Sequence, residues 1–403
     1  MKLLRDVLDS VGKQFHPGGK FERLFPLYDA ADTFLFSTAY TTKANTHVRD
    51  GLDQKRMMIT VVFALVPCIL MALFNTGYQI HLAVEGGGAL LDTWQTAVFT
   101  ALGMPTSSSD IVACMVHGAL YFLPVVLVTY TVGGIAEVAF CLVRGHEVNE
   151  GFLVTGMLIP LTLPPTVPLW QVGLGAAFGI VIGKEIFGGT GMNFLNPALT
   201  ARAFLFFAYP AQLSGEVWIA ADIADGVSGA TWLASFAEGA GHLPGLTYWD
   251  AFVGLIPGSM GETSALAALI GAAMLLYTRI AAWQTMAGVT VGTALMALGL
   301  EAIGSETNAM MNLPFHWHFV LGGWAFGMVF MATDPVSSAF TPTGKLIYGF
   351  LIGVLAVLIR TINPAYPEGM MLAILFMNMF APLIDHYVVA ANKRRRAARY
   401  AQT

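Results

Sequence analysis

Charged residues are scarce in this sequence of 403 residues. Asp, Glu, Lys and Arg make up only 11% of it, against about 25% in soluble globular domains. Hydrophobic residues account for 56%, and the mean hydropathy is +0.66. This balance excludes an ordinary soluble protein and predicts an all-α integral membrane protein that crosses the bilayer many times. We expect a lipid bilayer as its surroundings and no nucleic-acid partner.

Cysteine is also scarce. Cys68, Cys114 and Cys141 all fall in apolar segments, and none has C-x-x-C spacing. This argues against a disulfide framework or an iron–sulfur site made by this chain alone, and leaves open one cysteine shared with another subunit's cluster. We expect three small buried side chains. We also expect no metal site, because His316 and His318 are two residues apart and do not share a helix face.

Basic residues are absent from four segments between apolar runs, 75–110, 210–263, 303–316 and 364–369. The opposite connections carry Arg144, Lys184, Arg279 and Lys345. Nine of the twenty Lys and Arg residues lie in residues 1–56, and five more lie in the tail from Lys393. By the positive-inside rule both termini are predicted to be cytoplasmic, and the number of spans is even.

Ten apolar segments predict membrane spans, several of them too short for a full helix. The segments are about 57–75, 118–142, 152–164, 168–183, 195–209, 264–278, 282–303, 317–333, 345–362 and 370–390. The chain then divides into a cytoplasmic N-terminal extension, a transmembrane domain and a basic cytoplasmic tail, at residues 1–55, 56–392 and 393–403. The long loop 210–263 is predicted on the non-cytoplasmic face.

Two of the short spans contain helix breakers. Segment 152–164 runs into Pro164-Pro165, and segment 195–209 opens at Asn196-Pro197. Proline blocks helix continuation, so these spans are either half helices that frame a ligand site or ordinary kinked helices.

A weak internal similarity suggests a repeat of five helices. Gly175–Val181 resembles Gly323–Val329, and a helix-breaking pair follows each copy. The predicted topology runs both copies in the same direction, whereas five plus five spans imply an inverted repeat. The orientation of the repeat therefore stays open.

One polar loop carries a motif for covalent chemistry. Residues 225–231 read Asp-Gly-Val-Ser-Gly-Ala-Thr. A D-G-x-S-G-A-T run is the acceptor signature of proteins that carry FMN esterified through its phosphate to threonine, here Thr231. Asp225, Ser228, Gly229 and Ala230 complete the motif. A threonine hydroxyl is a weak nucleophile, so a separate flavin transferase must deliver the FMN. The alternative is a glycine turn in which Thr231 caps a helix.

Further motifs are spread over the chain. They are Arg144–Gly151, Gly183–Gly191 leading into Asn193–Ala198, Pro257–Glu262, Met331–Pro335 and Phe380–His386. With the FMN motif, they resemble the NqrB family, the flavin-carrying B subunits of the bacterial Na⁺-translocating NADH:quinone oxidoreductase. A sister family, the RnfD subunits of the Rnf ferredoxin:NAD⁺ complex, shares the S-G-A-T loop and typically lacks the long N-terminal extension.

The resemblance implies a membrane component of a six-subunit complex in the bacterial inner membrane. In that family, electrons from NADH pass through other subunits to FMN on the neighbouring C subunit. They continue to FMN on the B subunit, to a non-covalent riboflavin and to ubiquinone, coupled to Na⁺ export. No G-x-G-x-x-G site for NADH stands out in this chain, so NADH oxidation is expected elsewhere.

The quinone and sodium candidates lie in or near apolar spans. The family's quinone region corresponds to Gly133-Gly134, with Glu137 one turn later; helix packing is the alternative for the glycines. Carboxylates at membrane depth are costly and are therefore functional candidates. The resemblance implies that Asp334 and Asp385 are sodium candidates, while Glu137 is either interfacial or a ligand of sodium or a proton. A solvated carboxylate at the membrane boundary is the alternative for Asp334 and Asp385.

Three polar residues near the broken fifth span are candidates for flavin contacts. Asn193 and Asn196 offer amide donors and acceptors to a flavin ring edge or ribityl chain, and helix capping is their alternative role. Arg202 looks unpaired and either snorkels to the interface or binds a flavin's polar edge.

Two other functions compete with the sodium pump component. An RnfD-type subunit is a flavin carrier without quinone chemistry. A plain solute channel or transporter with broken helices binds no flavin at all.

Overall fold

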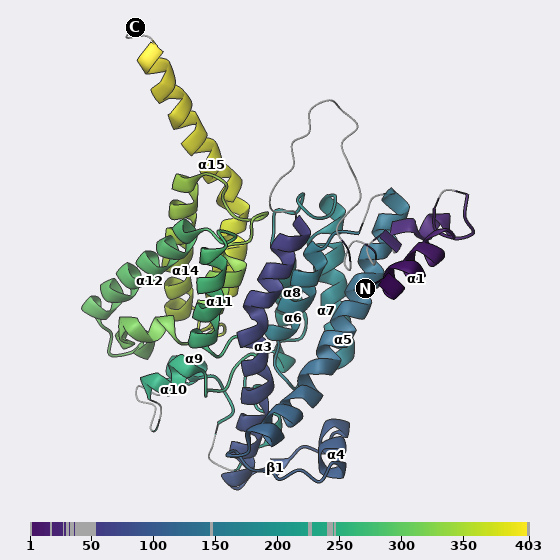
Figure 1. Ribbon diagram of the computed structural model, residues 1–403. Helices are drawn as coiled ribbons and strands as arrows, with labels where there is room; N and C mark the ends of the chain where they lie inside the picture. The colour runs from purple at the N-terminus through teal and green to yellow at the C-terminus, as the bar shows by residue number, and fades with distance from the viewer. Residues whose placement is uncertain are drawn as a thin grey trace.

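Long apolar helices form the body of the molecule (Figure 1). The computed structural model describes residues 2–16, 18–26, 28, 29, 32, 36, 54–145, 148–224, 228–239, 245 and 247–400. Among these residues, six helices are long and apolar enough to cross a membrane. They are α3 (Gln54–Glu85), α5 (Ile111–Arg144), α7 (Leu169–Val181) with the following turn η2 (Glu185–Phe187), α12 (Trp283–Ile303), α14 (Pro342–Ile362) and α15 (Met370–Tyr400). The predicted all-α membrane fold is confirmed.

Three apolar helices are too short to cross a bilayer, which takes about 20 residues. They are α6 (Gly151–Leu161), α8 (Pro197–Ala208) and α11 (Ala265–Tyr277). α6 ends before Pro164-Pro165 instead of kinking there. α8 begins where the Asn196 side chain accepts hydrogen bonds from the N–H groups of Ala198 and Leu199. The half-helix interpretation of these two segments is confirmed.

The predicted span 317–333 is also broken. It consists of the 3-10 turn η5 (Phe315–Phe319), the single turn α13 (Trp324–Phe326) and the π-turn η6 (Gly327–Met331). Gly322 and Gly323 interrupt it with φ angles of 66° and 64°, which favour glycine. The similar sequence Gly175–Val181 lies inside the continuous helix α7. The two copies of the internal similarity therefore have different backbones.

α3 and α5 extend well beyond the predicted spans 57–75 and 118–142. The sequence signal fades in α3 because polar residues follow Phe74, but these side chains have partners inside the protein. Asn75 donates to the carbonyl of Ile256, Gln79 donates to Asn75, and His81 contacts His117 of α5. Buried polar groups with partners cost little, so the helix continues through them.

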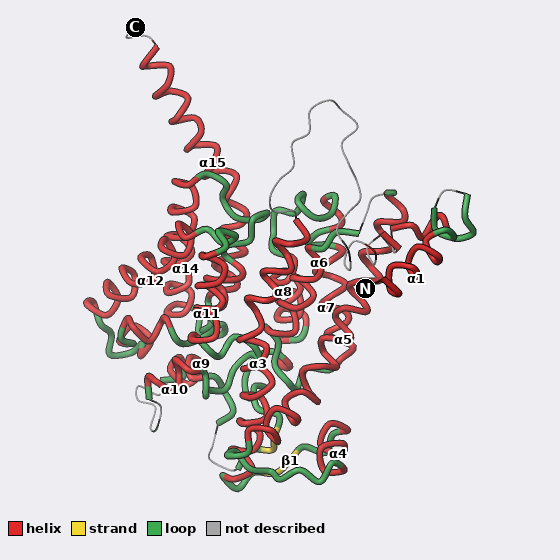
Figure 2. The backbone as a smooth tube through the Cα atoms, in the orientation of Figure 1, coloured by secondary structure: helices red, strands yellow, loops and turns green. Residues whose placement is uncertain are grey.

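Short elements gather below the long helices in Figure 1. Figure 2 shows the only strand pair of the described residues, β1 (Ala89–Leu90) and β2 (Ala221–Asp222), which is antiparallel with Ala89 opposite Asp222. The loop 210–263 is partly folded, since it contains β2 and two short helices. The elements around this end are α4 (Trp94–Ala101), η3 (Pro210–Gln212), α9 (Trp232–Ala237), α10 (Tyr248–Val253) and η4 (Ala309–Asn312).

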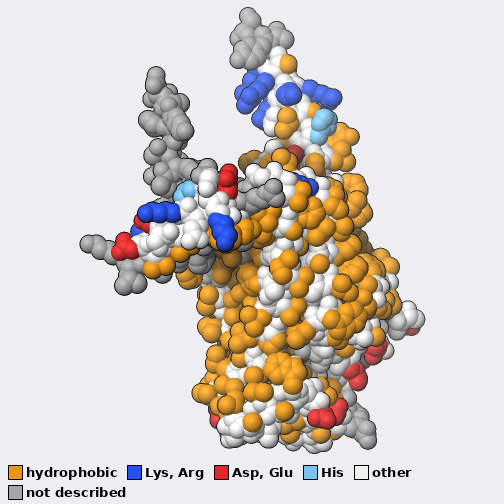
Figure 3. Space-filling view, turned by 90° about the vertical axis from the view of Figure 1, so that its right-hand side faces the viewer, with side chains coloured by type: hydrophobic (Ala, Val, Ile, Leu, Met, Phe, Trp, Pro, Cys, Tyr) orange, Lys and Arg blue, Asp and Glu red, His pale blue; other side chains and the backbone are white. Residues whose placement is uncertain are grey.

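Both described ends of the chain lie toward the upper end of Figure 1, where α1 (Lys2–Gly12), η1 (Glu22–Leu24) and the end of α15 are found. Figure 3 shows a broad hydrophobic belt around the middle of the molecule. On that face, Lys and Arg gather toward the upper end, whereas acidic side chains lie toward both ends. This distribution suits a protein that crosses a bilayer with both ends on one side.

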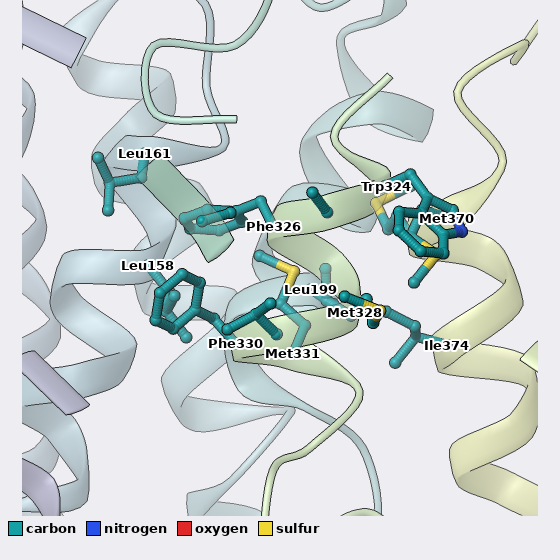
Figure 4. Packing of buried hydrophobic residues seen from close by; sticks show 14 of the residues in the cluster. Leu158, Leu161, Leu199, Trp324, Phe326, Met328, Phe330, Met331, Met370 and Ile374 are labelled. Atoms are coloured by element: carbon teal, nitrogen blue, oxygen red, sulfur yellow. The ribbon is translucent and has the colours of Figure 1, made fainter. Parts of the chain in front are cut away.

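The broken segment 315–331 lies in the core of the molecule (Figure 4). Phe326 and Phe330 face Leu158 and Leu161 of α6, while the α15 side chains lie on the other side of the segment. These residues belong to one buried cluster that joins the first five apolar helices to the later ones. The non-helical backbone of this segment is therefore enclosed by protein, as membrane depth requires.

Candidate functional site

Thr231 caps α9 at the end of the molecule away from the termini. Its side-chain oxygen accepts the N–H of Ala234 at 3.3 Å, and the residue is only 7% exposed. The capping role considered from the sequence is thus real. It uses a lone pair of the oxygen, whereas esterification replaces the hydroxyl hydrogen. A cap and an FMN phosphoester are therefore chemically compatible.

The residues before Thr231 combine exposure with tight packing. Ser228 is exposed and its hydroxyl accepts the N–H of Ala230 at 3.2 Å. Gly229 is buried, and a Cβ there would overlap the Ile223 side chain. A larger residue at Gly229 would therefore require the end of the Ile223 side chain to shift. Asp225 of the motif lies outside the described residues.

Two small cavities, the outer cavities, meet at Thr231. Their volumes are about 20 Å³ and about 30 Å³, and Glu368 lines both. Ligand pockets commonly measure about 300–1,000 Å³, so a flavin ring attached at Thr231 has to lie outside these cavities. The space beside the hydroxyl suits a small polar group, which fits the phosphate end of an FMN and not its ring.

Arg202 forms part of the wall of one outer cavity. Its guanidinium lies 2.7 Å from the carboxylate of Glu262 and donates to the Ser259 hydroxyl at 3.2 Å. The side chain is 10% exposed, so the predictions of an unpaired and of a snorkelling arginine are both wrong. The partner was missed because it lies 60 residues away in the Pro257–Glu262 motif.

That motif also completes the backbone of α6. The N–H groups of Met260 and Gly261 donate to the carbonyls of Leu163 and Leu161, at 3.1 and 2.8 Å. The end of a half helix leaves carbonyls without partners, and an unpaired carbonyl at membrane depth is costly. The segment therefore holds the end of α6 and, through Glu262, the side chain of Arg202.

Tyr366 is an outer-cavity residue that sequence reasoning missed. Its phenol is buried and has no hydrogen-bond partner within the described part of the chain. Burial raises the pKa of this phenol above its ordinary value, so the group remains an O–H donor. A buried donor without a partner beside Thr231 and Arg202 is a suitable contact for an anionic group.

A second cavity, the inner cavity, lies at the upper end of the bundle. It measures about 80 Å³ and is lined by Asn193, Asn196 and Asp334 together with residues of α3, α6 and α11. The sequence assigned these three residues to a flavin and to sodium separately, and the structure places them around one space. Arg202, grouped with the two asparagines from the sequence, lies instead at Thr231.

Some polar groups of the inner cavity already form hydrogen bonds within the protein. Asn193 donates to the carbonyl of Leu195 at 2.9 Å, and Asn196 uses its side-chain oxygen to cap α8. The Asp334 carboxylate accepts from Ser337 and from the N–H of Val336, and it has no ion pair among the described residues. Capping thus explains Asn196 in part, while Asp334 has no cationic partner among the described residues.

Glu137 is connected to the inner cavity by Lys184. The ammonium of Lys184 lies 2.8 Å from the Glu137 carboxylate, and both residues are almost fully buried. Lys184 also forms part of the cavity wall. Sequence reasoning used Lys184 as a topology marker and as part of the Gly183–Gly191 motif. It did not predict the pairing with Glu137 of α5, because that pairing has no local signal.

The glycine pair of α5 packs against Phe152 of α6. A Cβ at Gly133 would lie 2.7 Å from the Phe152 ring, whereas one at Gly134 would lie 3.5 Å from it. Helix packing therefore accounts for Gly133, and Gly134 has ordinary contact distance. Both glycines lie one turn before Glu137 on the same helix.

Asp385 has a structural role. Its carboxylate accepts from the N–H groups of Phe340 and Thr341 and from the Thr341 hydroxyl, at 2.6, 3.0 and 2.6 Å. It thereby fixes the start of α14 to α15. Unlike Asp334, it does not line the inner cavity.

The cysteines are buried, as predicted, and none of the three forms a disulfide. His318 is buried and lies 3.3 Å from the Arg360 guanidinium through its Nδ1 atom. No group of three or more His, Cys, Asp or Glu side chains in the described ranges is arranged to hold a metal ion.

Comparison with known proteins gives consistent matches over the whole chain. The model of the family described as NQR2, RnfD, RnfE matches residues 41–394. A protein of Chromohalobacter salexigens, named as the B subunit of a Na⁺-translocating NADH-quinone reductase, is 57% identical over 399 residues, which cover 98% of this chain and 96% of the relative. Proteins of the same name from Pseudomonas aeruginosa and Pseudoalteromonas atlantica are 55% and 53% identical, each covering 98% of this chain and 99% of the relative.

Proposed function

Because the chain belongs to the NQR2, RnfD, RnfE family, we propose that it is the membrane-embedded B subunit of a Na⁺-translocating NADH:ubiquinone reductase. In this proposal it carries FMN on Thr231 and passes electrons through riboflavin to ubiquinone, coupled to Na⁺ export. The other subunits of the six-subunit complex oxidise NADH. The complex lies in the bacterial inner membrane with both termini of this chain in the cytoplasm.

The observation that carries the proposal is that two polar sites share one short helix, α8, the first at its start and the second beside its middle. Asn196 caps the start of this helix at the inner cavity, and Arg202 lies six residues later on the wall of an outer cavity. Six residues of α-helix advance about 9 Å. Electron tunnelling falls steeply with distance, so two redox stations in one chain need to be close together. The short helix supplies that proximity between a Thr231-linked group and a group in the inner cavity.

The residues of the two sites fit the two flavins in different ways. At Thr231 the hydroxyl provides the point of attachment, and Arg202 and Tyr366 provide a cation and a donor beside it. In the inner cavity Asn193, Asn196 and Asp334 offer donors and acceptors suited to the polar edge of a flavin. The cavity holds only an edge of the ring unless flexible lining side chains such as Met57 and Met58 move. Bound flavins supply the electron-transfer chemistry, and these side chains position them.

Quinone chemistry separates this function from that of an RnfD-type subunit. We expect Gly134→Leu to slow the quinone-dependent reoxidation of reduced flavins by roughly tenfold or more, because it fills space beside Phe152 without a forced clash at its Cβ. Stopped-flow absorbance of the purified complex measures this rate. Gly133→Ala is the matched packing control, with an expected cost of about 1–3 kcal/mol in stability. Reoxidation that never depends on added quinone would favour the RnfD-type carrier.

Sodium coupling is assigned to Asp334 in preference to Asp385. We expect Asp334→Asn to raise the Na⁺ concentration for half-maximal turnover by about tenfold, because it removes the carboxylate that lines the inner cavity. Asp385→Asn is the control, since its carboxylate anchors α14 and its loss is expected to lower the melting temperature at an unchanged Na⁺ requirement. Titration of turnover with Na⁺ distinguishes them. An increased Na⁺ requirement in Asp385→Asn alone would reverse the assignment.

A further inference from the structure

Lys184 is the one ammonium group on the wall of the inner cavity within the described residues. It follows α7 and is 2% exposed. A lysine is rarely buried to this degree unless its charge is matched and used. Its position between α5 and the inner cavity therefore indicates a function for its ammonium group.

The carboxylates around Lys184 satisfy its charge but not all of its donors. Its ammonium lies 2.8 Å from Glu137 and 3.7 Å from Glu185, and Arg144 lies 3.7 Å from the other oxygen of Glu185. The four groups together carry no net charge. An ammonium has three N–H donors, and only one carboxylate oxygen lies within 3 Å of it. At least one donor is left for a group in the cavity.

The neighbouring wall adds a second unsatisfied donor. The hydroxyl oxygen of Thr190 is buried without a hydrogen-bond partner in the described chain, and Thr190 lines the same cavity. Unsatisfied buried polar atoms are uncommon in folded proteins, and a cluster of them marks a place where a ligand supplies the partners. The inner cavity is thus lined by donors from Lys184 and Thr190 and by an acceptor, the carboxylate of Asp334. A ligand with hydrogen-bond acceptors along one edge suits the two donors.

We propose that Lys184 is the charged residue that positions the redox ring of the inner cavity and sets its affinity for electrons. The inference rests on the proposed function, because the ring is the non-covalent flavin assigned to this cavity. The ammonium donates to an electronegative oxygen or nitrogen at the ring edge and is held in place by Glu137. A flavin bound there would supply the electron-transfer chemistry, and the buried ammonium of Lys184 would stabilise negative charge on its ring.

The arrangement also explains why Glu137 is buried. Glu137 lies one turn after Gly133 on α5, and its carboxylate pairs with Lys184 at the cavity wall. Glu137 is then a positioning residue for Lys184, and α5 is connected to the ring through this ion pair. If the ring gained negative charge, it would attract the Lys184 ammonium more strongly and so compete with Glu137 for it.

The test compares Lys184→Met, Lys184→Arg and the double variant Glu137→Gln with Lys184→Met in the purified complex. Acid-extractable flavin per covalent flavin is expected to fall about tenfold in Lys184→Met, as for the loss of one hydrogen bond from a charged donor. The remaining non-covalent flavin is expected to have a more negative midpoint potential in a spectroelectrochemical titration. Lys184→Arg keeps the charge and is expected to restore most of the potential.

The double variant removes both charges and so separates the role from misfolding, because it leaves no unpaired buried carboxylate. It is expected to fold and still to show the flavin loss and the potential shift. Lys55→Met is the matched control, since Lys55 pairs with Glu150 at the same end of the bundle and does not line the cavity. Wild-type flavin content and potential in the double variant would overturn the role of Lys184. Wild-type complex without extractable flavin would instead refute the proposed function.

Discussion

Thr231→Asn is expected to abolish covalent flavin binding while leaving the fold of the loop intact. Asparagine has no hydroxyl to esterify, but its side-chain oxygen caps a helix as well as threonine does. The cap bond to the N–H of Ala234 is therefore kept. Intact-chain mass and in-gel flavin fluorescence are the measurements, and both signals of FMN should disappear. Turnover with quinone is expected to fall at least about 100-fold, since one station of the electron path is missing.

Thr231→Ser and Ser228→Ala serve as its controls. Serine keeps both the hydroxyl and the cap, so fluorescence is expected to remain. Ser228 is exposed and supports only the Ala230 N–H, so its loss is expected to leave the FMN in place. Thr231→Ala combines loss of the hydroxyl with loss of the cap, which costs about 0.5–2 kcal/mol, and is less informative. A fluorescent band in Thr231→Asn would refute the attachment site. A wild-type band without fluorescence, from cells that express the flavin transferase, would favour the flavin-free transporter.

The spans were predictable because membrane-spanning helices need long apolar runs, and this requirement is local. Helix breakers such as Asn196-Pro197 are also local, and they correctly marked α8 as a short helix. The ends of α3 and α5 were not predictable from hydrophobicity. Their polar residues, such as Asn75 and His117, are buried through partners far away in the chain. Hydropathy cannot represent such partners.

The candidate site residues that belong to a sequence motif could be proposed from the sequence. The contacts between residues far apart in the chain could not. Thr231 follows from its motif, and Asn193 and Asn196 follow from the resemblance and from the broken helix. The pairing of Arg202 with Glu262 links an α8 residue to the loop before α11, and only the fold brings them together. No partner for Arg202 could be predicted, because an arginine and a glutamate 60 residues apart carry no local signature.

That ion pair supports the second large prediction. Arg202→Met is expected to destabilise the subunit by about 3–5 kcal/mol, because it leaves the Glu262 carboxylate buried without a counter-charge. The side chains of the pair are 10% and 8% exposed, so solvent screens them little. The loss is a large part of the roughly 5–15 kcal/mol that holds a typical domain together. The melting temperature of the detergent-purified complex and the amount of assembled subunit are the measurements.

Two further variants distinguish the effect of leaving a buried charge unpaired from the effect of losing an ordinary arginine contact. Arg202→Met with Glu262→Gln removes both charges, so it is expected to recover part of the stability that Arg202→Met loses. Arg5→Met removes a half-exposed arginine paired with Asp9 and Asp32 and is expected to cost about 1 kcal/mol or less. Because Arg202 also lines the cavity at Thr231, the double variant has a second use. If it is stable and carries covalent FMN, a changed midpoint potential of that FMN assigns Arg202 an electrostatic role. An Arg202→Met complex as stable as the wild type would instead mean that water or another group compensates Glu262.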